Sequence, residues 1–259
     1  MSTIQRSFFL YFLICVLHLA PVCADFKPPP QIYIWTWDYP QDFSKLQLPP
    51  NAGVAFLAGT IHITKAGIYG EPRHCRMVAP SSIPLISVCR IELSPDFKEP
   101  LDQKLANKVC DLIIKYGHVD KINKLQIDFD ARLNERSFYK KIIATLQQRT
   151  NVKLSITALV SWCMFDSWLD KMNNLEIVPM FFSMGLDRNN ILEYFKNHPG
   201  YPGINYADNI GISLMESKVN KIMLFNLYQK NHFHLKTLYV FNPHPWTSFS
   251  LINALEYIK

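Results

Sequence analysis

Glycine is scarce in this chain, with 9 glycines among 259 residues, and no glycine-rich phosphate loop is present. The segment "GTIHITKAG", residues 59–67, contains two of these glycines but matches neither a Walker motif nor a dinucleotide-binding motif. The sequence therefore gives no support for a nucleotide-binding site, and we expect no cofactor.

Blocks of basic residues are also missing. The formal net charge is only +6, and lysine and arginine are scattered along the chain. Nucleic-acid binding proteins concentrate positive charge on one face or one segment. We therefore expect a glycan or another small polar ligand rather than a nucleic acid, and the sequence leaves the oligomeric state open.

Long apolar runs are confined to the N-terminus. Arg6 precedes the apolar segment 8–20, and the small residues Val22 to Ala24 follow it. This arrangement is typical of a secretory signal peptide, and the apolar run is short for a bilayer span. We predict a signal peptide at residues 1–24, cleavage after Ala24, a secreted or periplasmic protein, and no membrane span in the mature chain. An uncleaved N-terminal anchor is the alternative.

Cysteine is sparse in the predicted mature chain, residues 25–259, which keeps four: Cys75, Cys89, Cys110 and Cys163. Their spacing fits no zinc motif, and the sequence predicts no metal site. Exported proteins form disulfides, and three complete pairings are possible. We favour Cys75 with Cys89, while Cys110 and Cys163 could equally be buried thiols.

Strands and helices alternate through the mature chain. The expected strands cover residues 31–35, 52–63, 83–93, 125–130, 152–162, 176–182, 209–215 and 237–243. The expected helices cover residues 102–116, 134–149, 166–172, 187–197, 218–227 and 246–258. Eight strands separated mostly by helices predict one (β/α)8 barrel domain over residues 25–259, irregular between the second and third strands, at 59–84. A doubly wound open α/β sheet is the alternative.

The stretch "LQIDFDAR", residues 125–132, draws attention because apolar and polar residues alternate. In a barrel strand, one face packs on the helices and the other fills the interior. Asp128 and Asp130 should therefore point inward, with Asp130 nearer the C-terminal mouth, where active sites of this fold lie. Buried carboxylates need partners, and we expect Arg90 and serine or threonine hydroxyls.

Other candidates follow from the same alternation and from strand ends. Glu92 shares a face with Arg90, Glu216 follows the seventh expected strand, and Asn242 ends the last one. Four tryptophans are expected at or just after strand ends, where their rings could stack on sugars, although core packing is the simpler explanation for each one. They are Trp35, Trp37, Trp162 and Trp246.

Three motifs in order, "LQIDFDARLNERSFY", "LSITALVSWC" and "VPMFFSMG", resemble the bacterial exported family called domain of unknown function 3142. That resemblance covers most of the mature chain and implies a glycosidase-like barrel without an established activity. A more distant similarity is to glycoside hydrolase family 18, whose D-x-x-D-x-D-x-E run matches Asp128 and Asp130. Arg132 stands where that family has its catalytic glutamate, which removes the proton donor of the family 18 mechanism.

Two functions remain open. The chain could be an exported glycoside hydrolase with Asp130 as general acid, Glu216 or Glu92 as second carboxylate, and Asp128 and Arg90 tuning the pair. It could instead be a non-catalytic glycan-binding barrel of the cell envelope that uses the tryptophans and acids only for binding.

Overall fold

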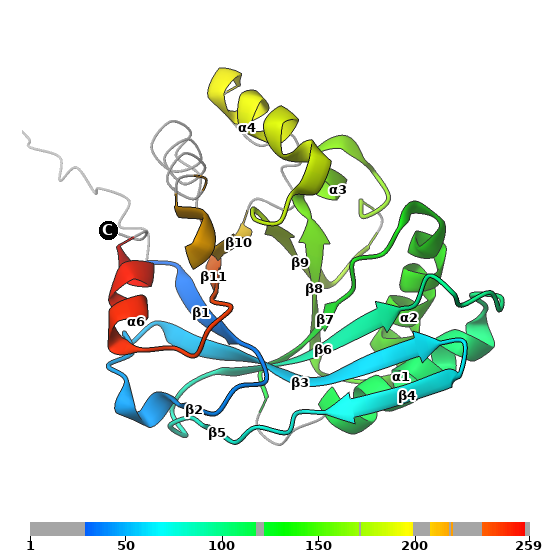
Figure 1. Ribbon diagram of the computed structural model, residues 1–259, viewed down its shortest axis with the longest axis horizontal. Helices are drawn as coiled ribbons and strands as arrows, with labels where there is room; N and C mark the ends of the chain where they lie inside the picture. Colours follow the sequence, from blue (N-terminus) through cyan, green and yellow to red (C-terminus); the bar gives the residue numbers. More distant parts are fainter. Residues whose placement is uncertain are drawn as a thin grey trace, which may run out of the picture.

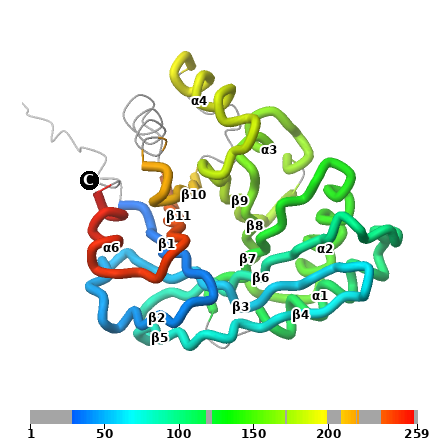
Figure 2. Tube along the Cα trace, in the orientation of Figure 1, coloured from blue at the N-terminus to red at the C-terminus, as the bar shows by residue number. Residues whose placement is uncertain are grey.

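The computed structural model of the chain describes residues 29–117, 122–170, 172–198, 208–217, 219 and 235–256. Eight of its strands form a closed parallel barrel (Figures 1 and 2). They are β1 (Gln31–Thr36), β3 (Ala52–Thr64), β6 (Leu85–Leu93), β7 (Lys124–Asp128), β8 (Lys153–Leu159), β9 (Leu175–Met180), β10 (Asn209–Ser213) and β11 (Thr237–Phe241).

Closure of the barrel depends on β1, which pairs in parallel with β3 on one side and with β11 on the other. An open sheet would leave its first or last strand unpaired along one edge. The predicted (β/α)8 barrel is therefore confirmed, and the doubly wound alternative is wrong.

The stretch between β3 and β6 is irregular, as the sequence predicted. β4 (Gly67–Pro72) folds back antiparallel onto β3, and β5 (Met77–Val78) pairs with the short β2 (Gln41–Asp42). Gly70 lies against the side chain of Tyr116 so closely that an added Cβ would overlap its ring. A hairpin packed on α1 thus occupies the place of a crossover helix.

Helices cover the outside of the barrel. They are α1 (Gln103–Gly117), α2 (Arg136–Arg149), α3 (Val160–Phe165), α4 (Arg188–Asn197) and α6 (Ser248–Leu255), and one-turn 3-10 segments lie at Phe43–Lys45, Leu133–Glu135, Gly185–Asp187 and Leu214–Glu216. Residues 218 and 220–227 of the expected helix at 218–227 lie outside the described residues.

The connection from β8 to β9 differs from the prediction. β8 ends at Leu159 rather than Trp162, and α3 begins at once, so the expected helix at 166–172 is absent. Trp162, Cys163 and Met164 are buried in the outer core. Short apolar runs are compatible with both strand and helix, and here their burial in the outer core accompanies the helix.

The barrel strands separate two apolar cores, one inside the barrel and one under the helices. Inward side chains such as Tyr33, Val88 and Phe241 fill the barrel, while the outward residues pack under the helices. A shift in register between Leu57 and Gly59 of β3 marks a bulge.

The four cysteines that the structure describes, Cys75, Cys89, Cys110 and Cys163, form no disulfide with one another. The favoured Cys75–Cys89 pairing is wrong because the Cys89 thiol points outward to the carbonyl of Ile113 in α1. Cys110 and Cys163 are buried thiols. None of the described helices has both the length and the apolar character needed to span a bilayer.

Candidate active site at the barrel mouth

The orientation of β7 follows the predicted alternation. Leu125, Ile127 and Phe129 pack in the outer core under the helices. Gln126 and Asp128 are buried on the opposite face and bond to neighbouring barrel strands. The acidic face of this stretch therefore looks into the barrel, where each carboxylate needs a partner.

Asp128 finds the two kinds of partner that the sequence predicted. The Thr157 hydroxyl donates a 2.6 Å hydrogen bond to its Oδ1, and the Arg90 guanidinium lies 3.8 Å from its Oδ2. Burial and the nearby charge of Asp130 nevertheless raise the pKa of Asp128 to about 6. Asp128 thus takes up a proton only slightly below neutral pH.

Asp130 lies two residues beyond Asp128, past the end of β7, and remains open to solvent. It forms no hydrogen bond or ion pair with any other residue that the structure describes. Desolvation raises the pKa of this carboxyl, and the positive charge of Arg90 opposes that shift. Asp130 is therefore a free carboxyl group beside a buried one.

Arg90 connects the acids of two strands. Its Nε lies 3.0 Å from Glu92 Oε1, and its guanidinium carbon lies 5.3 Å from the centre of the Trp37 ring. Glu92 also faces His62 of β3, with 3.4 Å between the carboxylate and the ring nitrogen. Arg90 and Glu92 thus belong to one charged cluster with Asp128.

A cleft of about 190 Å³ opens between the ends of β6 and β7. Its polar lining comprises Arg90, Glu92, Asp128, Asp130, Arg132 and Glu135. Four carboxylates face two arginines here, so the cleft carries excess negative charge.

Glu135 was not predicted as a site residue, although it is a buried carboxylate on this cleft. Its Oε2 accepts a 2.8 Å hydrogen bond from the backbone N–H of Arg132. An acid three residues after the start of a helical turn typically caps that turn. The spacing of Arg132 and Glu135 was therefore the available signal.

Glu216 is placed elsewhere. It lies after β10, where its Oε1 accepts a 2.8 Å hydrogen bond from the backbone N–H of Ser183 and its Oε2 lies 2.8 Å from Arg188. These contacts join two neighbouring loops of the rim. Glu216 does not line the Asp128–Asp130 cleft.

The tryptophans do not form one exposed rim. Trp35 is buried inside the barrel, where its Nε1 donates a 3.2 Å hydrogen bond to Gln126. Trp162 is buried on α3, and Trp246 is buried with its Nε1 bonded to the carbonyl oxygen of Trp35. Trp37 is the member of the set that lies beside Arg90 and stays partly exposed.

Asn242 is buried just after β11, and its Oδ1 accepts a 3.3 Å hydrogen bond from the backbone N–H of His244. It supports the turn that follows the last strand, and it does not line the Asp128–Asp130 cleft.

A polar network forms the floor below the cleft. Glu176 of β9 accepts hydrogen bonds from Lys124, Ser155 and Tyr239, and Ser155 also accepts one from Gln126. Glu176 was not predicted as a site residue, although it lies two residues before the inward Val178 in β9 and therefore on the inner face of that strand. These bonds satisfy the charges inside the barrel and hold β7, β8, β9 and β11 together.

Within the described ranges, no group of three or more His, Cys, Asp or Glu side chains is placed to hold a metal ion. Comparison of the chain with models of known protein families gives no match, and a search of curated proteins gives none either. The resemblances drawn from the motifs therefore stay predictions.

Proposed function

We propose that the protein is a carbohydrate-active enzyme of the glycoside hydrolase type, with its site at the C-terminal mouth of the barrel. The observation that carries the proposal is the pair of Asp128, buried with a pKa raised to about 6, and Asp130, exposed and unpaired. Acid catalysis of glycoside cleavage needs a carboxyl group that keeps its proton near the working pH.

In this proposal the two aspartates share one proton under mildly acidic conditions. Asp130 faces the substrate and passes the proton to the leaving oxygen, while Asp128 holds it close by. Because the two groups interact, their titration belongs to the pair rather than to one residue. The positive charge of Arg90 lowers the pKa of Asp128 and so limits the rise that burial causes.

Glu92 is the preferred second carboxylate. It lines the same cleft, its side chain is about half exposed, and Arg90 orients it. Trp37 supplies an aromatic edge beside these groups, which suits the apolar face of a sugar ring. Arg90 and Trp37 are the proposed binding residues.

The test is a hydrolysis screen on a panel of polysaccharides and aryl glycosides, run at pH 4 to 8. We expect turnover by the wild-type protein on at least one substrate, with activity falling above about pH 6. Asp130→Asn and Glu92→Gln should each lower kcat at least a hundredfold. Asp111→Asn, on the exposed side of α1, is the matched control and should keep full activity.

A non-catalytic glycan-binding barrel is the second candidate, and the position of Glu216 favours it. That carboxylate is held by Ser183 and Arg188 instead of facing Asp130. Saturable binding on a glycan array without turnover, retained in Asp130→Asn, would support binding alone and contradict the hydrolase proposal.

We also propose that the protein is exported, on the strength of Arg6, the apolar segment 8–20 and the small residues before Asp25. N-terminal sequencing should show that the protein recovered outside the cytoplasm begins at Asp25. A mature protein that begins at Met1 would contradict cleavage.

A further inference from the structure

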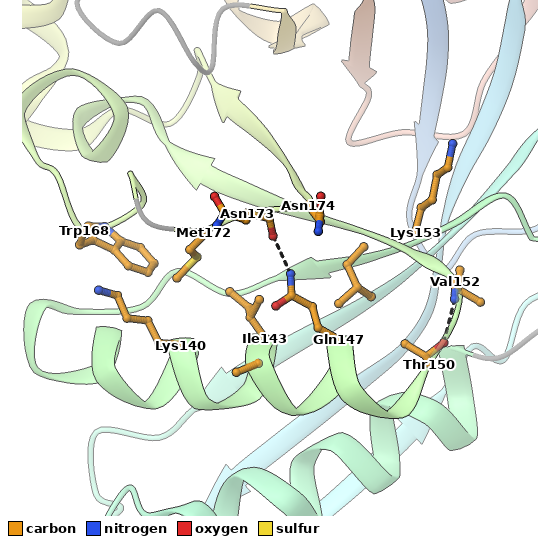
Figure 3. Close-up of a pocket in the computed structure, with 12 residues that line it drawn as sticks. Lys140, Ile143, Gln147, Thr150, Val152, Lys153, Trp168, Met172, Asn173 and Asn174 are labelled. Carbon is orange, nitrogen blue, oxygen red and sulfur yellow. Dashed lines mark hydrogen bonds between the residues drawn. The ribbon is translucent and has the colours of Figure 1, made fainter.

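A groove of about 660 Å³ lies on the outer wall of the barrel, away from the mouth (Figure 3). The helix α2 forms one side, and the segment Met172 to Asn174, which leads into β9, forms the other. Val152 and Leu154, at the start of β8, contribute to its lining. This volume is within the range of small-molecule sites in proteins.

The groove exists because the β8–β9 connection lacks a long helix. α3 is only six residues long and follows the C-terminal end of β8 directly. The chain then returns to β9 through turns, and Gln147 of α2 donates a 2.9 Å hydrogen bond to the carbonyl of Asn173 across the gap. The outer face of early β8 is thus left without the helix that would cover it in a regular barrel.

Charge in the groove is of one sign. Its twelve lining residues include Lys140 and Lys153 and no acidic residue, and the Lys153 side chain points away from α2, so Lys140 carries the charge of the groove. Neither lysine forms an ion pair with any residue in the described part of the chain. The rest of the floor is largely apolar, with Ile143, Leu154 and Met172 among its members.

One end of the groove carries a cation. The ammonium of Lys140 lies 5.8 Å from the centre of the Trp168 ring. The Trp168 indole is nine-tenths buried, and its Nε1 has almost no accessible surface. Lys140 is therefore the group at this end that can attract an anion.

We propose that this groove binds an anionic single-chain amphiphile. The apolar chain lies along Ile143, Leu154 and Met172, and the carboxylate or phosphate headgroup lies at the end formed by Lys140 and Trp168. From Lys140 to its last residue, Arg149, α2 extends about 14 Å at 1.5 Å per residue. That length suits a medium acyl chain better than a bulky ring system.

The proposed groove is independent of the proposed glycosidase site. Leu154 points outward from β8 into the groove, whereas Thr157 of the same strand points inward to Asp128. The two sites therefore occupy opposite faces of one strand, and either can exist without the other.

The experiment uses the chain from Asp25 to Lys259 and three twelve-carbon probes below their micelle concentrations. Dodecanoate and dodecyl phosphate carry anionic heads, and dodecyltrimethylammonium carries a cationic one. Titration calorimetry should show saturable one-to-one binding of both anions, and the stronger of the two identifies the headgroup. The cation should bind at least tenfold more weakly.

Ala144→Trp is the blocking variant, because Ala144 is exposed on α2 and lines the groove without belonging to the core. It should weaken anion binding at least tenfold. Gln148→Trp, on the same helix but outside the groove, is the matched control and should leave binding unchanged. Circular dichroism of both variants checks that they fold.

Lys140→Glu should weaken binding of both anions about tenfold, and Lys108→Glu on α1 should not. Three results would overturn the proposal: no saturable binding by the wild-type protein, equal affinity for the cation, or full binding by folded Ala144→Trp. A protein without glycoside hydrolase activity can still give these binding results. The two proposals can therefore be refuted independently.

Discussion

The raised pKa of Asp128 predicts how stability depends on pH. The group titrates near pH 3.8 when exposed and near pH 6 in the folded protein, so the folded state binds more protons between these values. The free energy of unfolding must therefore fall as pH rises through this window. At 1.36 kcal/mol per pKa unit, the full loss is about 3 kcal/mol.

Asp128→Asn isolates this effect, since asparagine is close in shape, can accept the Thr157 hydrogen bond and does not ionise. Relative to wild type, the variant should gain about 2.5 kcal/mol of stability between pH 4 and pH 7.5. For a chain of this size, the gain amounts to about 5–10 °C in Tm. Asp128→Asn also removes the attraction between the carboxylate and Arg90. That loss changes the size of the stability difference at both pH values, but not the direction in which the difference changes with pH.

The measurement is urea unfolding followed by tryptophan fluorescence at half-unit pH steps, for wild type, Asp128→Asn and the surface control Asp111→Asn. The difference between wild type and Asp128→Asn should change with pH, while the difference for the control stays flat. If the Asp128→Asn difference is constant from pH 4 to 7.5, the carboxyl is not perturbed and the reasoning is refuted.

Three further perturbations test separate parts of the structure. Arg90→Gln should raise the pKa of Asp128 further, since Arg90 lowers it, and carboxyl chemical shifts during a pH titration measure the change; an unchanged midpoint would contradict the contact. Gly70→Val should destabilise the protein by about 1–3 kcal/mol in urea unfolding, because the new side chain overlaps Tyr116, and an unchanged urea midpoint would contradict this close packing. Cys75, Cys89, Cys110 and Cys163 should all be alkylated in denaturant without reductant, and mass spectrometry showing any protected pair among them would contradict the absence of a disulfide.

The barrel could be predicted because the residue patterns of its strands and helices are local and recur along the chain. Strands such as Leu125 to Asp128 show apolar and polar residues alternating with the strand period, and the helices between the strands show their own period. The inward direction of Asp128 and its contacts with Arg90 and Thr157 followed from that alternation. Neighbouring strands in register bring such residues together.

Positions near strand ends were less predictable. Apolar runs suit both strand and helix, and the run predicted as strand up to Trp162 places this residue in α3, buried in the outer core. Glu216 follows its strand as expected, but its direction depends on Ser183 and Arg188, which come from another loop. Contacts between loops leave no periodic trace in a sequence, so the direction of Glu216 could not be predicted, whereas the alternation along β6 placed Glu92 on the face of Arg90.

Closure of the barrel makes completion of the fold depend on one late strand. β1 must pair with β11, which begins at Thr237, more than two hundred residues after β1 starts. Until that strand is available, the sheet has two open edges whose backbone groups can pair with other chains. A chain cut short before Thr237 therefore keeps both edges exposed, and the pairing of β11 with β1 and β10 covers them.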